Sequence, residues 1–158
     1  MAGELADRDI PVITAPLLNL PSSFETMASD ETGPQRLAEA GVDIAFFDPG
    51  TGFTHNARLL PQLAGNAVAG GMDHTAAMRA VTLVPARIFG LDRELGTLER
   101  GKLADVVIWN GDPFELSSRP SHVFVEGNET SLDNRQSRLA RRYRDLIRGD
   151  LPVQYRND

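Results

Sequence analysis

GTLERGKLADVVIWNGDPFE, residues 96–115, predicts a strand held between two turns and so decides the second half of the fold. Gly96 and Gly101 bracket a polar loop. Residues 104–109 are rich in β-branched and aromatic side chains, which favour a half-buried strand. The NGDP turn at 110–113 ends that strand, because glycine tolerates positive φ and proline fixes its own φ.

Upstream of this stretch, apolar runs alternate with helical patterns. Residues 10–15 (IPVITA) and 42–47 (VDIAFF) predict two buried strands. A short helix is predicted between them at 34–40, with Pro34 in its first turn and Gly41 at its end. Strands that alternate with helices are typical of βα units with parallel strands.

Two more helices are predicted after the second strand. Residues 57–69 carry leucines near an i, i+3, i+4 spacing, and Gly70-Gly71 stops the pattern. Asp73 is a predicted N-cap for a helix that runs through Val81. Pro85 is expected to interrupt the chain before a turn at 86–89.

The remainder is predicted to be β-rich and then helical. After strand 104–109 we expect a strand at about 121–125 and a short third strand at 129–132. Asp133 is a predicted cap for a last helix through Ile147. The element order therefore predicts an α/β fold with a β-rich patch near its C-terminal end.

Composition places the chain among ordinary soluble globular proteins. Its 158 residues are 41% hydrophobic and 24% charged, with a net charge of −6, which argues against nucleic acid as the main partner. The absence of cysteine excludes disulfides, thiolate zinc sites and thiol nucleophiles. There is no apolar run of about 18 residues, so no membrane span is expected. We expect a soluble protein of the bacterial cytoplasm or periplasm.

The first candidate for chemistry follows the second predicted strand. Asp48 comes directly after the strand, and His55 lies in the same loop. Reactive side chains in βα folds lie at the carboxyl ends of strands, where a carboxylate and an imidazole can bind a divalent metal or exchange protons with water. The alternative is turn chemistry at Asp48 and a solvated His55, since two residues do not complete a metal site.

The other candidates favour structural roles. His74 and His122 show no metal-ligand spacing, so we expect them to be structural. Six arginines lie between residues 134 and 148, which could contact a polyanion. Aspartates interleave with these arginines, so a solvated helix face is the alternative expectation.

Taken together, five stretches resemble the C-terminal part of the amidohydrolase superfamily, in its imidazolonepropionase-like and prolidase-like branch. The stretches at 76–92 and 96–116 are similar to the last barrel helix and the return to a small β-sandwich. Residues 122–146 are similar to the final strands and C-terminal helix. Residues 10–25 and 42–72 are similar to the seventh and eighth barrel strands with the segments that follow them.

The resemblance implies the last two βα units of a (β/α)8 TIM-like barrel at 1–92, strands of an accessory β-sandwich at 93–132, and a C-terminal helix and tail at 133–158. It also implies a hydrolase of carbon–nitrogen bonds in small amide or dipeptide-like substrates, with water activated by zinc or another divalent metal. Of the metal ligands in this family, only the aspartate that ends strand eight can be carried over, to Asp48. The family's H-x-H pair is absent from this sequence, and Lys102 stands in a loop before the sandwich strands.

We therefore expect a C-terminal piece of an amidohydrolase that is inactive and binds no metal alone. Two alternatives belong to other classes. The chain could be a non-catalytic module that completes its sheet with a second copy or with a separate barrel half. It could instead bind a polyanion through its arginine-rich helix. Neither nucleic acid nor membrane is the expected main partner.

Overall fold

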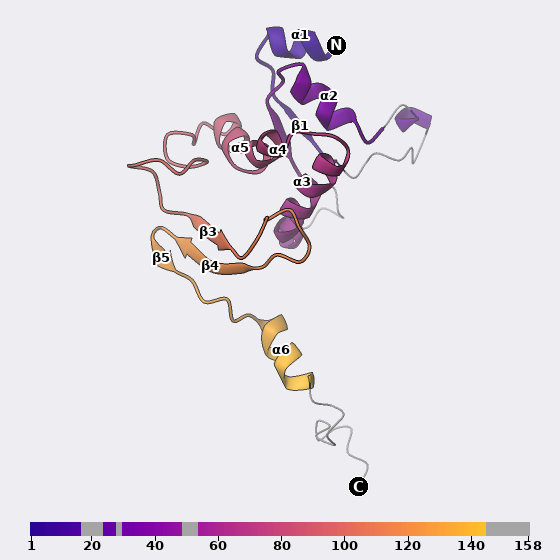
Figure 1. Ribbon diagram of the computed structural model, residues 1–158. Coiled ribbons are helices and arrows are strands. Elements are labelled where there is room, and N and C mark those ends of the chain that lie inside the picture. Colours follow the sequence, from indigo (N-terminus) through magenta and orange to yellow (C-terminus); the bar gives the residue numbers. More distant parts are fainter. Residues whose placement is uncertain (17–23, 28–29, 49–53, 145–158) are drawn as a thin grey trace.

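The computed structural model describes residues 1–16, 24–27, 30–48 and 54–144 (Figure 1). In the first half, strands alternate with helices, as the sequence predicts. In the second half, β-strands follow one another before the last helix. In chain order they are α1 (Ala2–Asp7), β1 (Val12–Thr14), η1 (Phe24–Thr26), α2 (Gly33–Glu39), β2 (Ile44–Phe46), η2 (Thr54–Leu59), α3 (Leu60–Ala69), α4 (His74–Val81), α5 (Leu83–Ile88), β3 (Val106–Trp109), β4 (Pro120–Val125), β5 (Asn128–Glu129) and α6 (Arg135–Tyr143).

A two-stranded parallel sheet organises the first half. β1 pairs with β2 in the register Val12 with Ile44, Ile13 with Ala45, and Thr14 with Phe46. Both strands are shorter than the apolar runs that predict them. Helices α2, α3, α4 and α5 all contact β2, so they form a layer beside this sheet (Figure 1).

One face of the parallel sheet makes the core. Ile44 and Phe46 are buried in a cluster with small side chains of α3 and α4, including Ala64 and Ala77. Successive side chains of a strand point to opposite faces, so Ile13, Ala45 and Phe47 belong to the other face. Ala45 on this face is buried, whereas Ile13 is 49% exposed and Phe47 is 43% exposed, so the second face keeps apolar surface open at these two residues.

The helix ends of the first half follow the predicted local chemistry. Pro34 lies in the first turn of α2, and Gly41 follows that helix with φ of 84°. Asp73 caps α4, where its side chain accepts a hydrogen bond from the Ala76 N–H at 2.9 Å. The predicted interruption at Pro85 is wrong, because α5 begins at Leu83 and includes Pro85. Proline is tolerated in the first turn of a helix, since the N–H groups of that turn have no carbonyl partner within the helix.

The second half is an antiparallel sheet in the order β3-β4-β5. The predicted third strand at 129–132 is wrong in its bounds. Glu126 (φ 50°) and Gly127 (φ 78°) form a tight left-handed turn, so β5 begins at once, at Asn128. Seen in Figure 1, the sheet lies beneath the helical layer and α6 projects beyond the sheet.

The loop between β3 and β4 joins the antiparallel sheet to the helical layer. Phe114 of this loop packs against the core cluster. Its backbone lies so close to α3 that a Cβ at Gly65 would come within 2.8 Å of the Phe114 carbonyl oxygen. Glycine at position 65 therefore permits this close approach of loop and helix.

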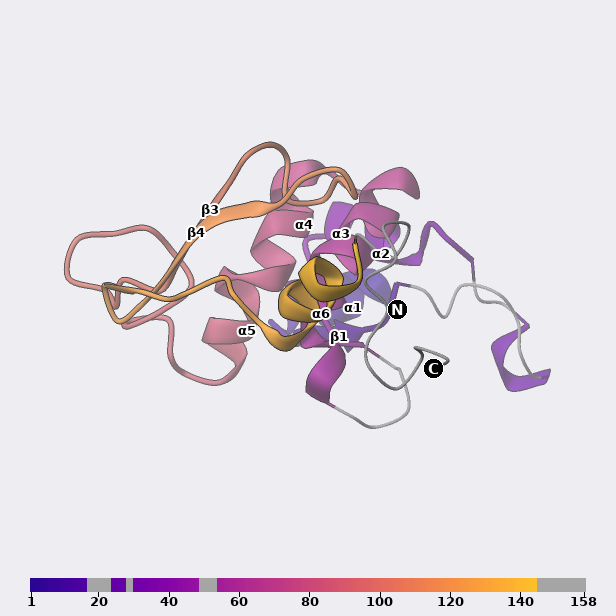
Figure 2. The same cartoon turned by 90° about the horizontal axis from the view of Figure 1, so that it is seen from below.

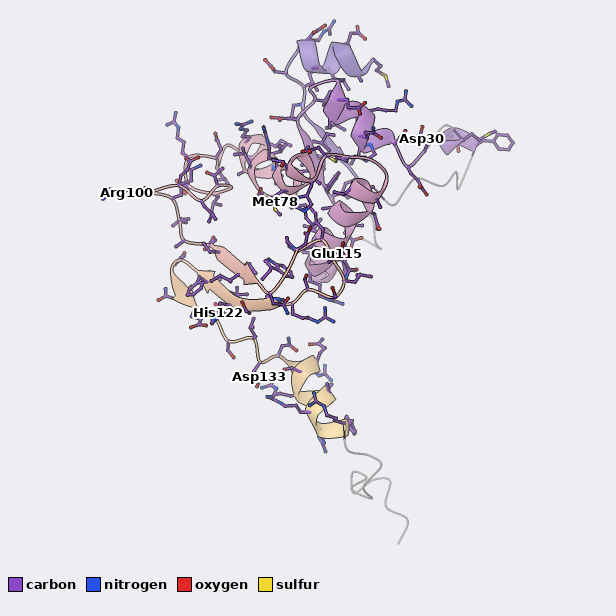
Figure 3. All side chains as sticks on the ribbon, in the orientation of Figure 1. Asp30, Met78, Arg100, Glu115, His122 and Asp133 are labelled. Carbon is purple, nitrogen blue, oxygen red and sulfur yellow. The ribbon has the colours of Figure 1, made fainter. Side chains whose placement is uncertain are left out.

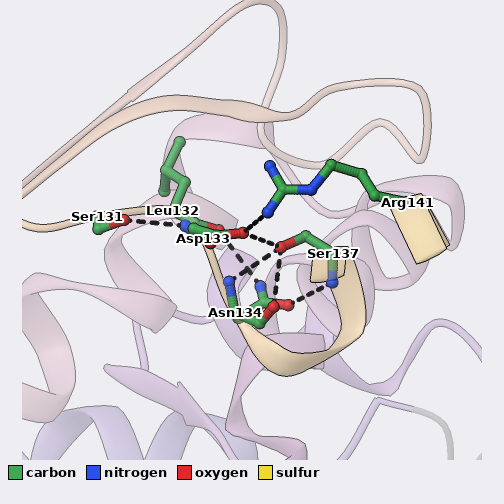
Figure 4. Close-up of polar contacts among 6 residues, drawn as sticks. All are labelled: Ser131, Leu132, Asp133, Asn134, Ser137 and Arg141. Atoms are coloured by element: carbon green, nitrogen blue, oxygen red, sulfur yellow. Dashed lines mark hydrogen bonds and ion pairs between the residues drawn. The ribbon is translucent and has the colours of Figure 1, made fainter. Parts of the chain in front are cut away.

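The last helix begins one residue later than predicted. Asn134, not Asp133, is its N-cap, because the Asn134 side chain accepts from the Ser137 N–H at 2.9 Å. Asp133 accepts instead from the Ser137 hydroxyl at 2.7 Å and from Arg141 (Figure 4). The predicted end at Ile147 lies outside the described residues. In the part of the chain that is described, no helix has the length and apolar character to cross a membrane.

Candidate functional site

The carboxyl ends of β1 and β2 lie side by side, and Asp48 follows directly. The Phe47 N–H donates to the Thr14 carbonyl at 3.1 Å, which continues the ladder one residue beyond β2. Asp48 therefore leaves the sheet at its carboxyl edge, where loops carry catalytic groups in βα folds. Its side chain is half-buried, and its Oδ2 atom is buried.

His55 lies on η2, downstream of Asp48. Its side chain lies outside what the structure describes, as do residues 49–53 between it and Asp48. The predicted meeting of these two side chains thus stays a prediction.

The described residues do not fit a complete metal centre. Among residues 1–16, 24–27, 30–48 and 54–144, no group of three or more histidine, aspartate or glutamate side chains could hold an ion. A catalytic zinc takes about three protein ligands. Asp48 could supply one of these ligands, so a complete zinc site needs further ligands from outside the described residues.

At the opposite edge of the sheet, where the strands begin, the charged side chains join neighbouring elements. Asp43 precedes β2 and bridges two helices: its Oδ1 lies 3.6 Å from Arg79 of α4, and its Oδ2 lies 3.3 Å from Arg87 of α5. Two hollows of about 420 Å³ and 280 Å³ lie at this edge, both lined by Gly41, Val42 and Asp43. In barrel folds this end of the strands serves stability, whereas chemistry lies at the other end.

A polar contact far apart in sequence holds the antiparallel sheet to α4. His74 Nε2 lies 2.8 Å from Asp112 Oδ2, and the His74 ring lies 4.8 Å from the Phe114 ring between centroids. Asp112 is in the loop after β3, and its Oδ1 accepts from the Phe114 N–H at 2.9 Å. This contact could not be predicted from the sequence, because a turn aspartate and a helix-start histidine 38 residues apart carry no shared local signal.

The other histidine has an equally local environment. His122 Nδ1 on β4 lies 2.7 Å from Glu129 Oε1 on β5, and its ring stacks near Phe124. Both partners belong to the same sheet. These contacts are those of a side chain that joins neighbouring strands.

The Asp112 contacts predict an acid-sensitive contribution to stability. The Phe114 N–H, followed by the hydrogen bond and charge of His74, holds the pKa of Asp112 below its ordinary 3.8. A depressed folded-state pKa contributes stability at pH values above 3.8 that is lost as the pH falls through the folded pKa. We expect Asp112→Asn, which keeps an acceptor for Phe114, to reduce the loss of unfolding free energy between about pH 6 and pH 2.5.

Urea titrations at each pH measure this effect. Asp7→Asn, on the exposed surface of α1, is the matched control. An Asp112→Asn acid profile that coincides with the profile of the unmodified chain would contradict the assignment.

The sequence and the fold of this chain are both similar to those of known proteins. A family model described as the amidohydrolase family matches residues 18–130. An imidazolonepropionase from Aromatoleum aromaticum is 38% identical over 119 residues, which are 71% of this chain and 29% of that protein. A solved amidohydrolase from Thermotoga maritima matches with a TM-score of 0.73 and 29% identity over 82% of this chain and 33% of that one.

A solved prolidase, complexed with N-methylphosphonate-L-proline, matches with a TM-score of 0.58 and 21% identity over 82% of this chain and 37% of that one, which is a likeness of fold alone. Across these three proteins the chain spans between 29% and 37% of the relative's length. The α/β arrangement is that of the TIM-barrel class to which these structures belong. With more than half of its residues matched by the family model, the chain belongs to the amidohydrolase family.

Proposed function

We propose that this chain supplies the C-terminal part of a metal-dependent hydrolase of carbon–nitrogen bonds in small amide or dipeptide-like substrates. The observation that carries the proposal is the place of Asp48 at the carboxyl edge of the parallel pair β1–β2. A carboxylate there can serve as one ligand of a zinc or other divalent ion. Under this proposal, residues 1–92 are the end of a barrel, 93–132 belong to a β-sandwich, and 133–158 form a C-terminal helix and tail.

The proposal requires strands from elsewhere. Within the described residues, β1 and β2 pair only with each other, so each has an open edge. Closing a barrel removes such edges, and the chain's short share of its relatives' length leaves room for the missing units. The open face with Ile13 and Phe47 would then turn toward the barrel interior.

A hybrid protein tests the role of Asp48. Residues 1–158 replace the matching third of the Thermotoga maritima amidohydrolase, and the hybrid is assayed for metal content and for hydrolysis of dipeptides and acyl amides. We expect Asp48→Asn to lower kcat/KM by about 100-fold or more and to lower the bound metal per chain, because one ligand and proton acceptor is lost.

Asp9→Asn is the matched control for this substitution. Asp9 lies before β1, at the other end of the strands, and asparagine tolerates its positive φ of 50°. An Asp48→Asn hybrid with the activity and metal content of the Asp9→Asn hybrid would overturn the proposal. The isolated chain with added zinc is expected to show no turnover of the same substrates, because one carboxylate cannot hold the ion.

The second candidate is a non-catalytic module that completes its sheet with another chain. The open strand edges and the exposed Ile13 and Phe47 favour it. In that case the hybrid would fold and yet hydrolyse nothing, and the isolated chain would associate through this sheet. A hybrid with metal-dependent turnover decides for the enzyme.

A further inference from the structure

The turn after β3 contains the dipeptide Asn110-Gly111. The chain has seven asparagines, and Asn110 is the one that a glycine follows. Glycine has no side chain to hinder the approach of its own backbone nitrogen to the preceding carboxamide. Nucleophile and carbonyl carbon also belong to one molecule, which removes much of the entropic cost of bringing them together. The dipeptide therefore has the composition for attack of the Gly111 nitrogen on Asn110 Cγ.

The fold leaves both residues open to water. Asn110 and Gly111 are exposed. Within the described ranges, the Gly111 N–H donates no hydrogen bond, so its proton is available to a base from the solvent. Seen from below in Figure 2, β3 and β4 lie beside each other, and the loop between them, which contains the dipeptide, runs toward the helices. The turn therefore does not shield the reacting nitrogen.

The Asn110 carboxamide is held by a backbone donor. The Arg119 N–H donates to Asn110 Oδ1 at 2.7 Å, and the Asn110 N–H donates to the Arg119 carbonyl at 3.1 Å. Attack at Cγ moves negative charge onto Oδ1, and a backbone N–H that is aimed at that oxygen stabilises such charge. The two hydrogen bonds also close the base of the loop, so the donor is in place before the reaction begins.

We propose that Asn110-Gly111 is a self-modifying site whose products are aspartate and isoaspartate, and that the isoaspartate weakens the junction between the antiparallel sheet and the helices. A base from the solvent removes the Gly111 amide proton, and the nitrogen lone pair forms a bond to Asn110 Cγ. The Cγ–Nδ2 bond then breaks, and Nδ2 takes a proton from water and leaves as ammonia. The product is a cyclic imide between Asn110 and Gly111.

Water opens this imide in one of two ways. If it adds to Cγ, the bond from Cγ to the Gly111 nitrogen breaks and an ordinary aspartate results. If it adds to the backbone carbonyl carbon of residue 110, the bond from that carbon to the Gly111 nitrogen breaks. The main chain then runs through Cβ and Cγ of residue 110, which is isoaspartate. Each conversion consumes one water and releases one ammonia, and no oxidant or reductant takes part.

The place of the dipeptide gives the isoaspartate its effect. It lies between β3 and the anchors of the loop, which are the contact of Asp112 with His74 at 2.8 Å and the packing of Phe114 on the core. Figure 3 shows Glu115, the residue after Phe114, between the sheet and the helices. Isoaspartate lengthens the main chain by one carbon, so β3 and these anchors are displaced relative to each other. This inference does not depend on the proposed catalytic role.

Incubation of the full chain at mildly alkaline pH tests the modification. Ammonia release is followed, and peptide mass spectrometry with electron-transfer fragmentation identifies aspartate and isoaspartate at each asparagine. We expect Asn110 to convert first in the folded chain. Its rate should be no more than about tenfold below the rate of the same chain unfolded in urea, because the turn leaves the reacting groups open.

Two variants identify the reacting groups. Asn110→Gln moves the carboxamide one carbon further from the Gly111 nitrogen, and Gly111→Ala adds a Cβ beside that nitrogen. This Cβ would lie 2.7 Å from Ser118 Oγ, the end of a side chain that is free to rotate. Both variants should convert at position 110 at least about tenfold more slowly, a barrier higher by about 1.4 kcal/mol. Asn128→Gln, in another exposed turn, is the matched control and should leave the rate at Asn110 unchanged.

Thermal melts test the effect of the isoaspartate. Chain enriched in isoaspartate at position 110 should have a Tm about 3 °C or more below that of fresh chain. Asn110→Asp keeps a side-chain acceptor for the Arg119 N–H and the ordinary main chain, so its Tm should stay within about 1 °C of that of fresh chain.

Three results overturn the inference. One is an asparagine other than Asn110 that converts first in the folded chain. Another is a folded-chain rate at Asn110 more than about tenfold below the rate in urea, which shows that the turn shields the dipeptide. The third is an isoaspartate-containing chain that melts at the temperature of fresh chain, which shows that the junction is not affected.

Discussion

Phe46→Ala is expected to lower the free energy of unfolding by about 3–5 kcal/mol. Phe46 is the large side chain that β2 buries against α3 and α4, and its neighbours Ala64 and Ala77 are too small to fill the space that its ring would leave. A domain of this size has a total stability of only about 5–15 kcal/mol, so the variant should be close to unfolding.

Chemical denaturation followed by circular dichroism measures this loss. Phe24→Ala is the matched control, because Phe24 is 88% exposed and the same truncation there should change stability by about 0.5 kcal/mol or less. Equal effects of the two substitutions would show that the face of β2 with Ile44 and Phe46 is not the core.

Gly96→Ala is expected to cost about 2–5 kcal/mol from two separate causes. The backbone of Gly96 has φ of 91°, which alanine adopts at a cost of about 1–2 kcal/mol. A Cβ at this position would also lie 2.9 Å from the Ala86 Cβ and 3.0 Å from the Leu83 Cα, and such overpacking costs about 1–3 kcal/mol more.

Gly101→Ala separates the two causes. Gly101 has a nearly identical φ of 93°, but a Cβ there would have no heavy atom within 4 Å among the described residues. The Gly101→Ala variant should therefore lose only the conformational part. If Gly96→Ala and Gly101→Ala are equally stable, the loop at 96 does not pack on α5 as the structure places it.

Local chemistry made much of the fold predictable. The caps at Asp73 and Gly41 depend on one side chain or one backbone angle, and the residues that they bond lie within a few positions. The apolar runs at 10–15 and 42–47 likewise predicted the strands, but the structure pairs only three residues of each. A strand's length depends on how far its neighbour stays alongside, and that neighbour is distant in sequence.

The last helix shows how close alternatives are resolved. Asp133 and Asn134 are both good capping residues, and sequence alone favoured the first. The structure uses Asn134, because Ser137 then completes a reciprocal pair of hydrogen bonds while Asp133 remains available to Arg141. The choice depended on which arrangement satisfies more donors, which is a property of the folded turn.

The candidate site was predictable in part for the same reason. The position of Asp48 after a buried strand follows from the sequence, because a βα unit always carries its strand end to the same edge. The Asp43 bridge to Arg79 and Arg87, and the His74–Asp112 contact, join residues 36 to 44 positions apart. No periodicity or turn signal connects such residues.

The α/β class and the order of strands and helices were predictable from the chain's short-range patterns of apolar, turn and capping residues, whereas the family came from the resemblance of its five stretches to the amidohydrolases. The candidate aspartate came from both. The folded chain was needed to show which face of β2 is the core, where the antiparallel sheet meets the helices, and that the arginine-rich helix stands clear of its own sheet. Those outcomes depend on contacts between segments far apart in the chain, whose free energy exists only once the segments have met.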